Sequence, residues 1–211
     1  MAAQNAMKAV IHCHGGAATG HQDEGAEKFG DKAPVQFGYA VHQSIVPAAY
    51  PVGMPRDDVT EIELIDDCTA RLERIFRCTP EVLWDVMTDP ARIPEWWGPA
   101  HHSPTVVEMD VRVGGRWRFE LNAHENVFGF GGEYLELERP SLLVQTFVFD
   151  PFPDGGTVER ATLEAQPDGS TLFRVDVTHP TPEGRTNQLS SGMLEGMQET
   201  HRRLAALVAQ P

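Results

Sequence analysis

The sequence predicts an α+β protein in which a curved antiparallel sheet wraps around one long C-terminal helix. Strand-like runs follow one another from residue 69 to residue 179 with short turns between them, which favours an antiparallel meander. A short helical segment interrupts these runs early, and the last segment carries an amphipathic helical stripe. Because one apolar stripe and one apolar sheet face can bury each other, the sheet is expected to pack against this helix.

The N-terminal part of the chain differs from the rest. Residues 1–58 are rich in glycine and proline and show little helical or strand periodicity. Both residue types oppose regular structure. We therefore expect an N-terminal extension over 1–58, largely irregular or strap-like, and one folded domain over 59–211. Residues 59–65 are expected to form an edge strand.

The first strong signals of this domain are a strand and two short helices. Residues 71–76 alternate in part between charged and apolar side chains, which predicts a half-buried strand. Thr79-Pro80 is typical of a helix start, and Asp89-Pro90 ends that helix because the residue before proline avoids the helical region. A second short helix is expected at 91–96, so both helices follow the first strand of the meander.

The remaining strands are predicted from alternation and from the turn residues between them. Residues 116–121 alternate at every step, which places Trp117, Phe119 and Leu121 on one face. Glycines at 129–132 suggest a bulge or bend, and prolines and glycines at 151–156 suggest a turn. The other strands are expected at 105–111, 127–137, 142–149, 157–165 and 171–179, with a hairpin at Asp168-Gly169 between the last two.

The C-terminal segment 187–208 contains no proline and is predicted as one continuous helix. Its apolar residues recur at helical spacing: Leu189, Met193, Met197, Leu204 and Val208.

Three sequence segments in this order resemble a known superfamily. Residues 77–100 read RCTPEVLWDVMTDPARIPEWWGPA, residues 109–119 read MDVRVGGRWRF, and residues 131–140 read GGEYLELERP. They resemble the START/birch-pollen-allergen superfamily (SRPBCC), in the branch similar to the C-terminal domain of the heat-shock-protein-90 ATPase activator. The resemblance covers residues 69–209 and implies the helix-grip fold. The branch usually carries a Gly-Trp pair in the last helix, where this chain has Gly196-Met197.

The resemblance implies a pocket between the sheet and the C-terminal helix. We expect this pocket to hold a small hydrophobic or amphipathic ligand, with apolar walls and a few polar groups. The alternative is a filled core made by the same side chains. The candidate cavity residues are Trp97, Trp117, Phe119, Leu121, Phe128, Phe147, Met193, Met197 and His201, with Phe130 and Phe149 beside them.

Two other functions remain open at this stage. A cyclase- or dehydrase-like enzyme would use the same cavity, with His101, His102 or His201 as the acid or base. A co-chaperone-like module would act through its surface. No catalytic residue is assigned, because the sequence has no nucleophile elbow and no dinucleotide fingerprint.

Several other polar residues have both a structural and a functional interpretation. Asp110 and Arg112 are expected to pair at a turn. Gln145, Asp150 and Arg160 are isolated polar residues on apolar strands; any of them could face the cavity and orient a substrate carbonyl, but such residues more often lie outward or at the rim. The strongest metal-like spacing is the set His12, Cys13, His14 and His21. It lies in a glycine-rich stretch without a second Cys/His pair at finger spacing, so no metal and no cofactor are expected.

Charge and cysteine content limit the kinds of binding partner and the cell compartment that we expect. The chain has 211 residues and a net charge of -14, of which residues 1–59 carry -2 (4 basic, 6 acidic) and residues 60–211 carry -12. Such a domain offers no basic patch for nucleic acid and favours a neutral or cationic apolar ligand. Three cysteines form the odd, sparse set typical of a reduced cytosolic protein. With no signal peptide and no membrane-spanning run, we expect a cytoplasmic protein, and a homodimer is a further expectation.

Overall fold

A computed structural model describes residues 59–100, 102, 104–123 and 126–209. Within them, eight antiparallel strands form one sheet in the order β1-β2-β8-β7-β6-β5-β4-β3. Their bounds are β1 Glu61–Leu64, β2 Thr69–Phe76, β3 Pro104–Met109, β4 Arg116–Ala123, β5 Asn126–Glu138, β6 Leu142–Phe149, β7 Phe152–Ala165 and β8 Thr171–Thr178. The predicted extension over 1–58 lies outside the described residues.

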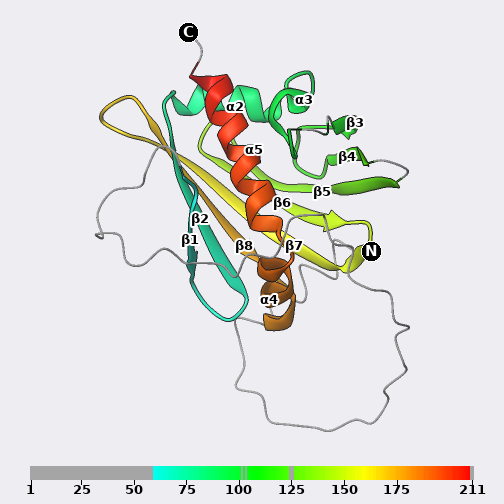
Figure 1. Cartoon of the computed structure of the whole chain (residues 1–211). Helices are drawn as coiled ribbons and strands as arrows, with labels where there is room; N and C mark the ends of the chain where they lie inside the picture. Colours follow the sequence, from blue (N-terminus) through cyan, green and yellow to red (C-terminus); the bar gives the residue numbers. More distant parts are fainter. Residues whose placement is uncertain (1–58, 101, 103, 124–125, 210–211) are drawn as a thin grey trace, which may run out of the picture.

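The helices lie at the two ends of the meander. Helices α2 (Pro80–Thr88) and α3 (Ile93–Trp96) connect β2 to β3, and helices α4 (Pro182–Ser190) and α5 (Met193–Val208) follow β8. Figure 1 shows α5 lying across one face of the curved sheet, which we call the inner face. The predicted α+β helix-grip fold is therefore confirmed. The two short helices follow the second strand, because the edge strand predicted at 59–65 is present as β1.

The inner face forms the core of the domain. Alternate residues of the strands point toward α5 and are buried, as in β2 and β8. From the helix, Leu204 (1% exposed) and Val208 enter the same cluster. His201 lies edge-on to Phe76 of β2 and Phe173 of β8, at centroid distances of 6.3 and 5.7 Å. Helix α5 therefore covers the β2–β8 side of the inner face.

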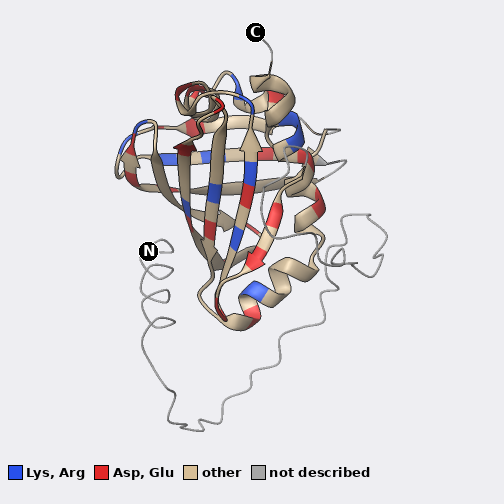
Figure 2. Ribbon diagram, turned by 90° about the vertical axis from the view of Figure 1, so that its left-hand side faces the viewer, with Lys and Arg blue, Asp and Glu red and all other residues tan. Residues whose placement is uncertain are grey.

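The opposite, outer face carries paired charges. Arg71 bonds to Asp176 at 2.7 Å, and Arg174 lies between Glu73 and Glu164. Figure 2 shows basic and acidic positions next to each other across the strands of the sheet. Cross-strand pairs of opposite charge stabilise a sheet and keep this face solvated. None of the described helices is both long enough and apolar enough to cross a membrane.

Two predictions about where elements begin and end are wrong in detail. The C-terminal segment is not one helix over 187–208, because Gly192 adopts a φ of +80° and separates α4 from α5. Only Gly tolerates that backbone conformation without strain. The turn expected at 151–156 is shorter, since β7 starts at Phe152 and pairs with Phe149.

The glycines of β5 do not form a bulge. The pairing of β5 with β4 and β6 stays regular through 129–132, and the irregularity lies between Tyr134 and Glu136. At Gly132, a Cβ atom would lie 1.8 Å from the Thr146 carbonyl oxygen and 2.7 Å from Trp117 Nε1. This glycine therefore allows the Trp117 indole to lie close to the strand.

Replacing Leu204 tests the packing of α5 on the sheet. We expect Leu204→Ala to lower the free energy of unfolding by about 3 kcal/mol, because it leaves a cavity in the core. Leu64→Ala, at a side chain that is 57% exposed, should cost less than about 0.5 kcal/mol. Urea denaturation measures both. Equal losses would contradict the central place of Leu204 in the core.

Candidate functional site

An aromatic cluster occupies the inner face on the β4–β6 side of the sheet. Its rings belong to Trp97, Trp117, Phe119, Phe130, Phe147 and Phe149. The centroid distances within it run from 4.8 Å for the stacked pair Phe130–Phe149 to 5.9 Å for Phe130–Phe147. Strands β4, β5 and β6 supply five of the rings because Phe119 pairs with Phe130, and Phe130 with Phe149. Trp97 reaches the cluster from the segment after α3.

The aromatic cluster is not fully covered by the described residues. Trp117 and Phe119 are buried, at 3% and 5% exposure, and form its floor. Trp97, Phe130 and Phe147 are half-buried, so part of their surface stays accessible. Apolar surface held partly open on a concave sheet can accept an apolar ligand.

The structure brings together most of the predicted cavity residues. Leu121 is buried beside Gly98, and a Cβ atom added at Gly98 would lie 3.3 Å from Leu121 Cδ2. Phe128 lies at the margin of the cluster, 6.0 Å from Phe149. Met193 and Met197 are half-buried on α5, and Met197 packs against the core. His201 faces the β2–β8 side.

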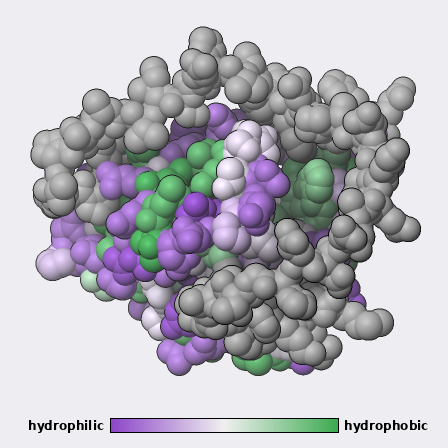
Figure 3. Space-filling model, turned by 90° about the horizontal axis from the view of Figure 1, so that it is seen from below, coloured by the Kyte–Doolittle hydropathy of each residue, from purple (hydrophilic) through white to green (hydrophobic). Residues whose placement is uncertain are grey.

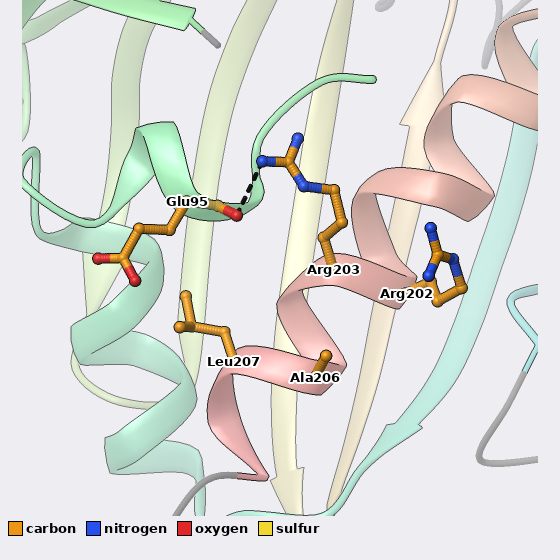
Figure 4. Close-up of a pocket in the computed structure, with 5 residues that line it drawn as sticks. All are labelled: Glu95, Arg202, Arg203, Ala206 and Leu207. Atoms are coloured by element: carbon orange, nitrogen blue, oxygen red, sulfur yellow. Dashed lines mark hydrogen bonds between the residues drawn. The ribbon is translucent and has the colours of Figure 1, made fainter. Parts of the chain in front are cut away.

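Two hollows on the described surface lie elsewhere. One of about 250 Å³ is lined by Glu95, Arg202, Arg203, Ala206 and Leu207, between α3 and α5 (Figure 4). Another of about 170 Å³ is lined by Glu61, Ile62, Glu63, Arg71 and Glu73. No predicted cavity residue lines either of these two hollows. The rings of the aromatic cluster contact one another, so they occupy part of the space predicted as a cavity. Seen from below, the described surface shows apolar patches separated by polar ones (Figure 3).

Arg203 fixes the segment that carries Trp97. Its guanidinium donates to the carbonyl oxygens of Gly98 (2.8 Å), Glu95 (2.9 Å), Pro94 (3.3 Å) and Trp97 (3.4 Å). Figure 4 shows the arginine reaching from α5 to the end of α3. The last carbonyl groups of a helix have no hydrogen-bond donor within the helix. The Arg203 guanidinium supplies donors to these groups. Trp97 is thereby held against Phe119 and Phe130.

His201 joins the helix to the start of the domain. Its Nδ1 lies 2.8 Å from the Thr60 hydroxyl, and the Gln198 amide exchanges two hydrogen bonds with the Thr60 backbone. Burial, together with the positive charge of Arg74, lowers the pKa of His201 to about 4. The imidazole is therefore neutral at pH 7. Its hydrogen bond to Thr60 and its contacts with Phe76 and Phe173 give it a structural role.

A polar pair on the inner face joins Gln145, one of the residues expected as able to face the cavity, to Glu159, which was not predicted. Gln145 of β6 and Glu159 of β7 are register partners, and Gln145 Nε2 donates to Glu159 Oε2 at 3.0 Å. Burial raises the pKa of Glu159, and the bond from Gln145 opposes this rise. Glu159 shares its face with the buried Ala161 and Leu163. The alternation of residues 157–163 indicates that Glu159 lies on the inner face. Its pairing with Gln145 follows only from the register between β6 and β7.

The other polar candidates do not enter this site. Asp110 and Arg112 form the predicted ion pair, at 2.7 Å and largely exposed. Asp150 bonds to Arg118 at 2.6 Å, and Arg160 bonds to Glu136 on the outer face. His102 is half-buried, and its backbone N–H donates to the Pro99 carbonyl. His101, His12, Cys13, His14 and His21 lie outside the described residues. Within the described ranges, no three His, Cys, Asp or Glu side chains are placed to hold a metal ion.

Comparison with known proteins agrees with this fold. The sheet, the two short helices and the long last helix define the helix-grip class of α+β proteins. The model of the family described as Activator of Hsp90 ATPase homolog 1-like protein matches residues 77–209. The chain belongs to this family. No curated protein matches it.

Several solved structures are similar over most of the domain. A protein of Rhodobacter sphaeroides is 27% identical, with a TM-score of 0.66 over 71% of this chain and 98% of its own. Protein CV1439 of Chromobacterium violaceum is 31% identical, with a TM-score of 0.57 over 68% of this chain and 99% of its own. Protein Ms6760 of Mycobacterium smegmatis, 24% identical, shares the fold with a TM-score of 0.63 over 71% and 96%.

The buried His201 makes stability depend on pH. In the unfolded chain a histidine titrates near 6.5, whereas the pKa of His201 in the folded state is about 4. As the pH falls from 6.5 to 4, the unfolded state binds a proton that the folded state does not. His201 should therefore cost about 3 kcal/mol of stability over this window. Urea denaturation at a series of pH values should show a shallower decline for His201→Gln, and parallel curves would exclude this role.

The Arg203 contacts predict a difference between two neighbouring arginines. We expect Arg203→Met to lower the free energy of unfolding by about 2 kcal/mol, because four carbonyl groups, three of them in part-buried hydrogen bonds, lose a charged donor. Arg202→Met is the matched control, since the Arg202 side chain is 66% exposed. It should change stability by less than about 0.5 kcal/mol. If both variants unfold at the same urea concentration, the role of Arg203 is refuted.

Proposed function

We propose that this protein binds a small hydrophobic or amphipathic molecule on the inner face of its sheet, over the aromatic cluster. The observation that carries the proposal is the exposure pattern of the cluster. Buried rings of β4 form a rigid floor, and half-buried rings of β5 and β6, together with Trp97, form an accessible apolar surface. Half-buried aromatic rings gathered on one face of a sheet form the kind of apolar surface that ligand sites use.

Two further features support this proposal. Proteins of this family have a fold that often holds hydrophobic ligands between sheet and helix. Aromatic rings offer large contact area with little conformational freedom to lose. The clamp of Arg203 on the segment after α3 fixes one wall of the surface before a ligand arrives, which lowers the ordering cost of binding.

The other functions stay predictions from the sequence. An acid–base role is not supported for His201, because its Nδ1 is bonded to Thr60 and its ring lies between Phe76 and Phe173. The family description refers to activation of a chaperone ATPase, and no contact in the described residues points to a chaperone. Cytoplasmic location, the absence of nucleic-acid and membrane partners, and a homodimer likewise rest on the sequence.

A fluorescent apolar probe tests the proposed function. We expect Nile red to gain fluorescence on addition of the protein and to be displaced by 1-octanol. Phe130→Ala should weaken binding by about tenfold, because it removes a ring that contacts Trp97, Phe147 and Phe149.

Val127→Ala is the control for this experiment. Val127 lies on the same strand and is 60% exposed, and its replacement should leave the affinity unchanged. No gain of fluorescence with the wild-type protein, or equal losses in the two variants, would contradict the proposed site. Thermal unfolding of both variants verifies that they are folded.

A further inference from the structure

The inner face carries polar groups that an apolar ligand would leave unused. Gln145 and Glu159 form a hydrogen-bonded pair on β6 and β7. Thr157 lies two residues before Glu159 on the same face of β7. It is 1% exposed, and its hydroxyl has no hydrogen-bond partner among the described residues. A buried hydroxyl without a partner is costly, so its retention points to a partner that binds there.

Among the residues that the structure describes, no ion pair joins the Glu159 carboxyl group to a basic side chain. Burial and the bond from Gln145 account for the direction of its pKa, and no basic side chain contributes. The side chain is half-buried on the inner face. A half-buried carboxylate without a counter-charge is destabilised, and a cationic partner would remove that penalty.

We propose that Glu159, Gln145 and Thr157 bind the ammonium group of a primary amine whose alkyl or aryl portion lies on the aromatic cluster. The inference rests on the proposed function and specifies its ligand class. A primary ammonium has three N–H donors and no acceptor. The three side chains offer three matching acceptors: the Glu159 carboxylate, Gln145 Oε1 and Thr157 Oγ1. Gln145 keeps its oxygen available because its nitrogen donates to Glu159.

The position of Phe147 connects the polar groups to the cluster. Phe147 is the register partner of Thr157 on the neighbouring strand. Its ring lies 5.6 Å from the Trp117 ring and 5.9 Å from the Phe130 ring. An ammonium group beside Thr157 would therefore adjoin aromatic surface, and ring faces attract cations. The carbon chain attached to it would continue over Phe130 and Trp97.

Matched ligands of equal chain length test this inference. Isothermal titration calorimetry at pH 7 with 150 mM salt compares n-octylamine with 1-octanol. We expect the wild-type protein to bind the amine at least about tenfold more tightly, as one charge-assisted hydrogen bond implies. Glu159→Gln, which keeps the shape of the side chain, should abolish this preference. Thr157→Val should reduce it in part.

Glu164→Gln is the matched control. Glu164 is on the same strand but on the outer face, where it bonds to Arg174 at 3.0 Å, so its replacement should retain the preference. A preference that survives Glu159→Gln would show attraction to the acidic surface and overturn the inference. If 1-octanol binds as tightly as the amine, the inference fails and the proposed function stands. If neither compound binds, both fail.

Discussion

The packing of helix α5 against β2 and β8 determines how the rest of the inner face is used. Leu204 and Val208 are buried with the core, and His201 packs between Phe76 and Phe173. Because a single helix is narrower than an eight-stranded sheet, it cannot cover the whole concave surface. The β4–β6 side is instead covered in part by α3 and the Trp97 segment, which Arg203 ties to α5. The aromatic cluster lies where that cover is incomplete.

Two kinds of polar group are found beneath the helices, and their surroundings distinguish them. Thr60, Gln198 and His201 bond to one another, and this set of bonds connects the first residues of the domain to α5. Thr157 and Glu159 lie on the same sheet but have unused hydrogen-bonding capacity. The first set is satisfied within the protein, whereas the unused capacity of Thr157 and Glu159 is what the proposed ammonium group would fill.

The order of strands and helices was predictable because period-two alternation and turn residues are local signals. The alternation of 116–121 correctly placed Trp117 and Phe119 on the buried face. The break at Gly192 was missed because a positive φ leaves no mark on the helical stripe around it. The Gln145–Glu159 pair was missed because it depends on the register between two strands. Whether rings pack together or enclose a space is likewise set by tertiary distances.

The indole N–H resonances of the four tryptophans offer the most direct test of the account. Trp97 and Trp117 belong to the aromatic cluster, whereas Trp84 is buried in α2. Titration with n-octylamine, followed by two-dimensional ¹H–¹⁵N NMR, should shift the Trp97 and Trp117 signals in a saturable way and leave the Trp84 signal in place. Saturable shifts at Trp84 with unmoved Trp97 and Trp117 signals would contradict a ligand site on the β4–β6 side of the inner face.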